Sequence, residues 1–244
     1  MNSFSYKEYI HILDLLQDHY PIMDYNEVGE DTDRFAVIRH DVEFSVERAY
    51  KMAELEARKG IFTSYMFQIR NNAYNTFSIQ NIKMIKEIYQ LGHKIGLHVH
   101  LGMLNDISGL KNYVESDIKS MGNFLHIPID RFSYHRPPKE VLRKELSLEN
   151  YINTYDKKYF DFKENDQDLE HVRIKYIADS KHRWNYGYPS EDLLKQYAKV
   201  QLLIHPYSWT EEGYESQKNF EELIKEKESI FRNTLKSETK HYKE

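Results

Sequence analysis

The sequence contains no cysteine among its 244 residues. That absence excludes disulfide frameworks, cysteine-ligated zinc, thiol catalysis and iron–sulfur clusters. No apolar run approaches the ~18 residues that a membrane-spanning helix needs. Lysine and arginine together (34) are fewer than aspartate and glutamate (39), so the net charge is −5 and there is no basic surplus for nucleic acid. We therefore expect neither a nucleic-acid partner nor a membrane span, and the oligomeric state stays open.

The beginning of the chain lacks the features of a secretory signal. Its first twenty residues alternate apolar with polar and charged side chains, without a basic region, an apolar stretch or a small-residue cleavage site. From this we expect a cytoplasmic protein. No linker rich in proline, glycine or serine divides the chain. We predict a single domain over 1–244, with a helical N-terminal extension (1–34), a barrel (35–209), and a C-terminal helix and tail (210–244).

Short apolar runs alternate with amphipathic segments along the chain. Runs rich in β-branched and aromatic residues predict buried strands at 35–38, 61–67, 94–99, 131–135, 151–155, 175–178 and 200–204. Helical periodicity predicts helices at 6–17, 46–59, 79–91, 110–124, 191–198 and 214–235. This alternation is typical of an α/β fold with a parallel sheet, either open and doubly wound or closed as a barrel.

Polar residues gather where five of the predicted strands end. They are Arg39–Glu43, His98–His100, His135–Arg136, Asp179–Ser180 and His205. Because α/β folds of both kinds place their active sites at the carboxyl ends of parallel strands, we expect these residues at one end of the sheet.

The spacing within two of these clusters indicates a metal site. Asp41 and Glu43 are two residues apart, so on a strand their side chains lie on one face, and the same holds for His98 and His100. Two imidazoles and two carboxylates at one end of a barrel provide nitrogen and oxygen ligands for a divalent metal that retains a water.

Five motifs occur in an order that resembles the polysaccharide deacetylase family, the NodB-homology group of carbohydrate esterase family 4. They are His40-Asp-Val-Glu43, Gly92-His-Lys-Ile-Gly-Leu-His98, Ser133-Tyr-His-Arg-Pro137, Ala178-Asp-Ser180 with Trp184, and Leu203-Ile-His-Pro206. The chain is most similar to the "HDVD" branch of that family, which is often found beside surface-polysaccharide biosynthesis genes. The resemblance spans about seven-tenths of the chain and implies a distorted, TIM-like (β/α)7 barrel that removes acetyl groups with the help of a metal.

The resemblance implies roles for the carboxylates and histidines of the first two motifs. Asp41 would be the catalytic base and Glu43 a metal ligand. Glu43 is longer than the family's usual aspartate, so an exchange of these roles, or direct metal binding by Asp41, stays open. His98 matches the first metal-binding histidine. The family's second histidine would fall at Gly102, and we predict His100 as its substitute.

The resemblance also assigns roles in the later motifs. Arg136 would orient and polarise the catalytic carboxylate, and Asp179 would hold His205, the general acid, in its protonated form because a neighbouring carboxylate favours the charged imidazole. Trp184 and Leu203 would line the acetyl pocket, and Tyr207 and Trp209 offer rings that can stack on a sugar. We predict substrate contacts from His135, Trp184, Leu203, Tyr207 and Trp209.

Together with the polar clusters, the resemblance implies a metal-dependent hydrolase that removes an acetyl group, N-acetyl in preference to O-acetyl, from a sugar or glycan precursor. Zn²⁺ is the expected cofactor, with Co²⁺, Mn²⁺, Ni²⁺ and Fe²⁺ as alternatives. Two other interpretations stay open. The barrel could hydrolyse a non-sugar C–N bond, as an allantoinase or imidase does. It could also be a catalytically inactive carbohydrate-binding homologue, which Gly102 favours.

Overall fold

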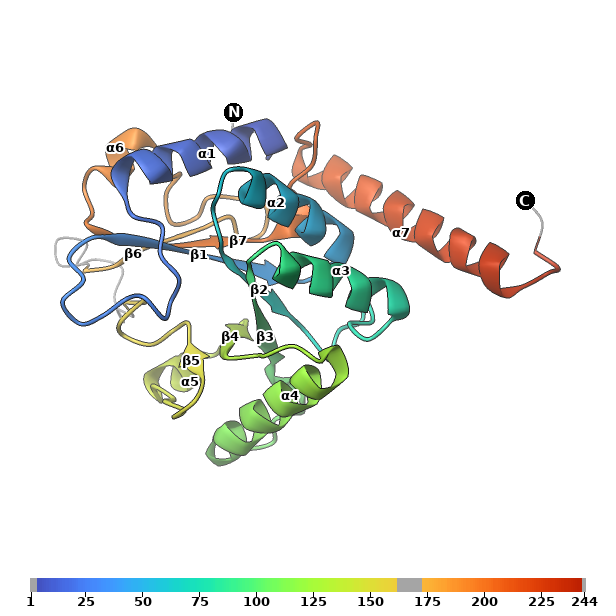
Figure 1. Cartoon of the computed structure of the whole chain (residues 1–244), viewed down its shortest axis with the longest axis horizontal. Helices are drawn as coiled ribbons and strands as arrows, with labels where there is room; N and C mark the ends of the chain where they lie inside the picture. Colours follow the sequence, from blue (N-terminus) through green and yellow to red (C-terminus); the bar gives the residue numbers. More distant parts are fainter. Residues whose placement is uncertain (1–3, 162–172, 243–244) are drawn as a thin grey trace.

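Seven parallel strands form one curled sheet in a computed structural model that describes residues 4–161 and 173–242. The strands are β1 (Phe35–Val42), β2 (Ser64–Phe67), β3 (Lys94–His100), β4 (Arg131–His135), β5 (Ile152–Asn153), β6 (Lys175–Ala178) and β7 (Lys199–Ile204). Their order is β5-β4-β3-β2-β1-β7-β6. Within the described residues β5 and β6 do not pair, so the barrel is open between these edge strands (Figure 1).

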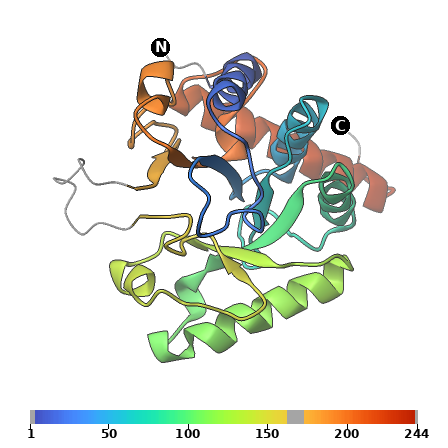
Figure 2. The same cartoon turned by 60° about the vertical axis from the view of Figure 1, so that its left-hand side comes forward.

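Helices surround the outer side of this sheet (Figure 2). They are α1 (Tyr6–His19), α2 (Val46–Arg58), α3 (Ile79–Gln90), α4 (Leu110–Leu125), α5 (Lys139–Arg143), α6 (Glu191–Leu194) and α7 (Ser216–Glu238), with short 3₁₀ turns η1 (Leu101–Met103), η2 (Ile107–Gly109) and η4 (Pro206–Ser208). The far end of α7 projects away from the barrel (Figure 1). In the described part of the chain, no helix has both the length and the apolar character to cross a membrane.

Helix starts follow from serine caps in the sequence. Ser45 accepts a hydrogen bond from the backbone N–H of Arg48 at the start of α2, and Ser78 does the same for Asn81 at the start of α3. Such caps satisfy amide groups that have no partner within the helix.

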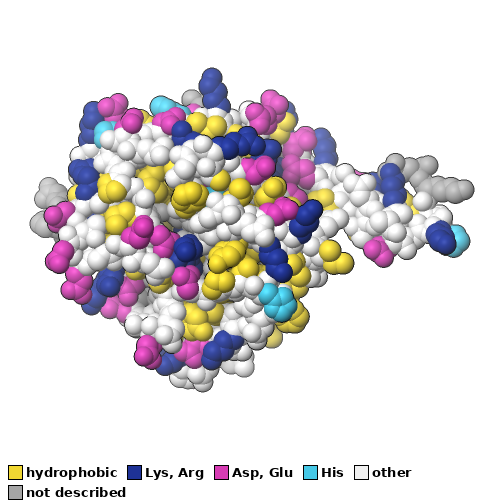
Figure 3. Space-filling model, viewed as in Figure 1, with side chains coloured by type: hydrophobic (Ala, Val, Ile, Leu, Met, Phe, Trp, Pro, Cys, Tyr) yellow, Lys and Arg dark blue, Asp and Glu magenta, His cyan; other side chains and the backbone are white. Residues whose placement is uncertain are grey.

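On the face of the molecule drawn in Figure 3, acidic and basic side chains are interspersed.

Strand β1 is buried along its whole length and separates two polar environments. Arg39 and Asp41 point into the barrel, where they contact Thr154 and Ser133 respectively. His40 points the other way, toward the helices. This alternation is the ordinary two-residue period of a strand. Because β1 is covered on both faces, it brings the catalytic candidates to the carboxyl end of the sheet on a rigid support.

His40, the side chain of β1 that points toward the helices, forms a hydrogen bond with Glu56, a fully buried residue of α2. Glu56 Oε1 accepts hydrogen bonds from Tyr9 and from His40 Nε2, the latter at 2.7 Å, and Oε2 accepts from Thr63 (2.9 Å) and Tyr65 (2.7 Å). Burial alone raises the pKa of Glu56, but the charge of His40 and these hydrogen bonds lower it to about 2. The ionised carboxylate therefore joins α1, α2, β1 and β2 behind the site.

The sheet confirms the predicted (β/α)7 barrel. All seven predicted strands and six predicted helices are present. The sequence missed α5, since five residues are too few to display a helical period, and it extended β5 and α6 beyond their observed ends. Residues 1–3 and 243–244 of the predicted N- and C-terminal extensions lie outside the described residues.

Candidate metal centre

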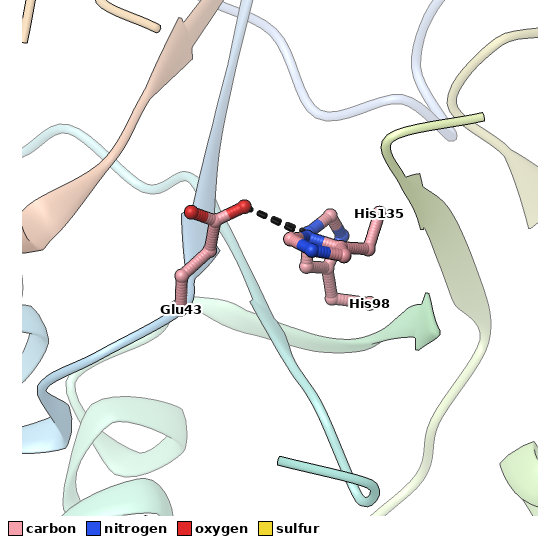
Figure 4. Close-up of side chains that lie close together, drawn as sticks. All are labelled: Glu43, His98 and His135. Carbon is pink, nitrogen blue, oxygen red and sulfur yellow. Dashed lines mark hydrogen bonds and ion pairs between the residues drawn. The ribbon is translucent and has the colours of Figure 1, made fainter. Parts of the chain in front are cut away.

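Three side chains meet at the carboxyl end of the sheet (Figure 4). Glu43 Oε1 lies 2.8 Å from Nδ1 of His135 and 3.6 Å from Nε2 of His98, and the two nitrogens are 3.3 Å apart. Ligand atoms around a tetrahedral zinc, at roughly 2.0–2.1 Å from the metal, lie ~3.4 Å from one another. The three atoms therefore fit a divalent metal, and two imidazoles with one carboxylate form a donor set that leaves a position open.

The orientation of His98 is fixed from behind. Ser133 donates a hydrogen bond to Oδ1 of Asp41 at 3.0 Å, so its oxygen accepts from His98 Nδ1–H at 2.7 Å. The proton then resides on Nδ1, and the lone pair of Nε2 points toward Glu43 and His135. Metal-binding histidines in proteins are commonly held in this way through their other nitrogen. The structure thus brings Glu43, and not Asp41, to Nε2 of His98, the nitrogen whose lone pair is free to bind a metal.

The arginine beside Asp41 is Arg39. Its guanidinium lies 3.4 Å from Asp41 Oδ2 and donates to Thr154 (2.6 Å) and Tyr155 (2.8 Å). Burial alone would lower the pKa of Arg39. The charge of Asp41 and of neighbouring groups raises it by more, so the pKa lies above its usual value. We predicted this role for Arg136, which is exposed instead. Arg39 was present in the first polar cluster, and its two-residue spacing from Asp41 was the signal that sequence reasoning missed.

His100, the predicted second histidine ligand, is not part of the three-residue cluster. Its Nδ1 accepts a hydrogen bond from the backbone N–H of Gly102 at 3.1 Å, and its ring stacks on that of His135 at 5.2 Å. A Cβ atom at Gly102 would lie only 2.8 Å from His100 Cε1, so a side chain there would displace the ring. The structure instead brings His135, which we predicted as a substrate contact, into the position of a ligand.

The predicted pair of Asp179 and His205 is present beside this cluster. Asp179 Oδ1 lies 2.6 Å from His205 Nδ1, and its two oxygens also accept from the His205 backbone N–H. Burial lowers the pKa of His205, but the charge and hydrogen bond of Asp179 outweigh it and raise that pKa to about 9. His205 is therefore protonated at neutral pH, and its Nε2 lies 4.0 Å from Glu43 Oε1.

The predicted tryptophans are in an aromatic cluster. Trp209 is fully buried and donates its Nε1–H to Asp179 Oδ2 at 2.8 Å, so its ring supports the carboxylate and offers no open face to a sugar. Trp184 is partly buried and packs near Trp209 and Phe4, with ring centroids 6.2 and 6.1 Å apart.

The remaining substrate candidates, Leu203 and Tyr207, are also buried. The Tyr207 ring lies 5.9 Å from that of His205 and 4.9 Å from that of Phe44, so it packs between these two side chains.

A cavity of about 280 Å³ opens beside the cluster of Glu43, His98 and His135. Glu43 and His135 form part of its wall, together with Gln68, Arg70 and Arg136. The cavity leads to two of the three ligand candidates, and it is large enough to admit part of a sugar.

No protein-family model and no curated protein matches the sequence. Among solved structures, the chain is similar to a family 4 carbohydrate esterase from Bacillus anthracis, with 14% identity, a TM-score of 0.43, and 91% of this chain and 86% of that chain covered. It is also similar to a chitin deacetylase from the fungus Colletotrichum lindemuthianum, with 11% identity, a TM-score of 0.45 and coverages of 79% and 81%. A third match is a CE4 family pseudoenzyme from Bacillus anthracis, with 11% identity, a TM-score of 0.41 and coverages of 83% and 63%. The first and third of these proteins are described as members of carbohydrate esterase family 4.

Proposed function

We propose that this protein is a metal-dependent hydrolase that removes an acetyl group from a sugar or glycan precursor, with N-acetyl groups preferred to O-acetyl groups. One observation carries the proposal. The open cluster of Glu43, His98 and His135 lies between a buried carboxylate, Asp41, and a protonated imidazole, His205. A Lewis-acid position flanked by a base and an acid is what hydrolysis of an amide requires.

The metal would be held by a carboxylate oxygen of Glu43, by His98 Nε2 and by His135 Nδ1, with Zn²⁺ as the proposed ion. A divalent metal in this position supplies Lewis-acid chemistry, which polarises an acetyl carbonyl and makes a water molecule more acidic. The residues around it determine how that chemistry is used.

Asp41 is the proposed base. Arg39 and Ser133 each bind one of its oxygens, which fixes the orientation of the carboxylate. It would take the proton of the water molecule as the water oxygen attacks the acetyl carbon. General base catalysis of this kind contributes typically about 10²–10⁴-fold in rate.

His205 is the proposed acid. Asp179 holds its Nδ1, so the remaining proton lies on Nε2, on the side of Glu43. That proton would pass to the sugar nitrogen as the C–N bond breaks, and the products are acetate and a free amine. The raised pKa of His205 keeps the proton available at neutral pH.

The direct test is acetate release by the metal-loaded protein from N-acetyl and O-acetyl sugars, in wild type and in Asp41→Asn. We expect release from an N-acetyl sugar that Asp41→Asn lowers by at least about 10²-fold, while the exposed control Asp33→Asn retains it. Opening of a cyclic ureide without acetate release would favour the alternative C–N hydrolase. Sugar binding without any turnover would favour the inactive homologue.

A further inference from the structure

The cavity beside the metal cluster is rich in hydrogen-bond donors and poor in free negative charge. Its wall includes two guanidinium groups, Arg70 and Arg136, and one carboxylate, Glu43, which is already engaged with His135. The positive charge of Arg70 is balanced by Asp117, with which it forms a bidentate ion pair. Arg136 differs from Arg70, since within the described residues no carboxylate forms a salt bridge with it.

The backbone directs Arg136 into this cavity. In an extended strand, neighbouring side chains point to opposite faces. Arg136 follows the last residue of β4 in the left-handed conformation, with φ of 46°, and both His135 and Arg136 line the cavity. This conformation is unfavourable for a residue with a side chain, and such strain is retained mostly at functional positions.

Gln68 provides a second, independent indication of a ligand. It is 3% exposed and lines the same cavity, and its side-chain nitrogen has no hydrogen-bond partner in the described part of the chain. Its side-chain oxygen already accepts from Asn71 at 2.7 Å. A buried donor without a partner is costly, and a turn of this side chain toward the cavity would let a ligand oxygen satisfy it.

We infer that the substrate carries an anionic group, a phosphate or a carboxylate, that binds Arg136 while its acetyl group lies at the metal cluster. This inference rests on the proposed function and specifies its substrate class as an acidic or phosphorylated N-acetyl sugar. The planar guanidinium of Arg136 suits two oxygens of such a group, and the Gln68 amide would donate to a further ligand oxygen once it turns toward the cavity.

The test compares acetate release from N-acetylglucosamine, from its 1-phosphate and from N-acetylmuramic acid, whose added group is a carboxylate. We expect the metal-loaded wild type to favour at least one of the two anionic sugars by about tenfold or more in kcat/KM. Arg136→Gln should abolish that preference by raising KM for the anionic sugar toward that of the neutral sugar. The exposed control Lys139→Gln should keep it. Whichever anionic sugar responds identifies the phosphate or the carboxylate.

A binding measurement separates failure of this inference from failure of the deacetylase proposal. Calorimetry with glucosamine 1-phosphate and glucosamine requires no turnover. Tighter binding of the phosphate that Arg136→Gln removes supports the anion site even if no acetate is released. Turnover of the neutral sugar with equal binding and equal kcat/KM for all sugars would retain the deacetylase and overturn the anion site.

Discussion

The hydroxyl oxygen of Ser133 lies 2.7 Å from Nδ1 of His98, its register partner across β3 and β4. The same hydroxyl donates to Asp41, so one side chain joins the proposed base to a proposed metal ligand. In this arrangement the base and the metal position are set by the pairing of two adjacent strands.

Removing that hydroxyl tests how much it positions His98. We expect Ser133→Ala to lower Zn²⁺ affinity by about 10–100-fold, because His98 loses the partner that fixes its tautomer. Isothermal titration with Zn²⁺ measures this, and the absorption spectrum of bound Co²⁺ reports the ligand geometry. The exposed Ser229→Ala is the matched control. Wild-type affinity and an unchanged Co²⁺ spectrum in Ser133→Ala would contradict this role.

Asp179 should set the titration of His205. The pKa of His205 is raised to about 9, so the stabilisation by this pair is fully present below the unfolded value of ~6.5 and is lost as pH rises through 9. Asp179→Asn should return the pKa toward ~6.5. An NMR titration of the His205 ring, identified with His205→Gln, checks this. A His205 pKa that stays near 9 in Asp179→Asn would show that another group charges the imidazole.

Glu56 should contribute to folding stability in the opposite pH direction. Its pKa is lowered to about 2, so its stabilisation is present above the unfolded value of ~4.3 and disappears as pH falls toward 2. Glu56→Gln should cost about 3–5 kcal/mol of unfolding free energy at pH 7, because it leaves buried donors mispaired. Urea unfolding measures this cost and its disappearance at low pH.

The control for Glu56 is Glu228→Gln, which breaks an exposed pair with Arg232 and should leave the unfolding free energy almost unchanged, because solvent screens such pairs. Equal costs for the buried and the exposed change would mean that the network around Glu56 contributes no net stability.

Double-mutant cycles test whether Arg39 or Arg136 interacts with Asp41. We expect a coupling free energy of about 1–3 kcal/mol between Arg39→Met and Asp41→Asn in urea unfolding, since the two groups are buried and paired. The cycle of Arg136→Met with Asp41→Asn should give no more than ~0.5 kcal/mol. A larger coupling free energy for Arg136 than for Arg39 would show that Arg136 is the partner of Asp41.

Much of the fold followed from local patterns, and part of the site did not. The alternation of apolar runs and amphipathic segments predicted every strand of the described residues, and the convergence of Glu43, His98 and His205 followed from their place at strand ends. The contribution of His135 depends on the register between β3 and β4, which pairs His98 with Ser133 and His100 with His135. No spacing within either strand reveals that register.

The choice between the two arginines was only partly open to sequence reasoning. The two-residue spacing puts Arg39 on the face of β1 that carries Asp41, but only the barrel interior shows that Thr154 and Tyr155, from the segment after β5, hold Arg39 beside Asp41. The turn of the chain at Arg136 depends on a left-handed φ that nothing in a His-Arg-Pro sequence announces.

Metal binding in three histidine variants tests the central claim most directly. The claim is that Glu43, His98 and His135 form the metal centre and that His100 lies outside it. We predict that wild type binds about one equivalent of Zn²⁺, that His98→Ala and His135→Ala each lower the affinity by about 100-fold or more, and that His100→Ala changes it by less than ~3-fold. Wild type that binds no Zn²⁺, Co²⁺ or Mn²⁺ would contradict the account. So would a His135→Ala variant that binds as wild type does while His100→Ala loses the metal.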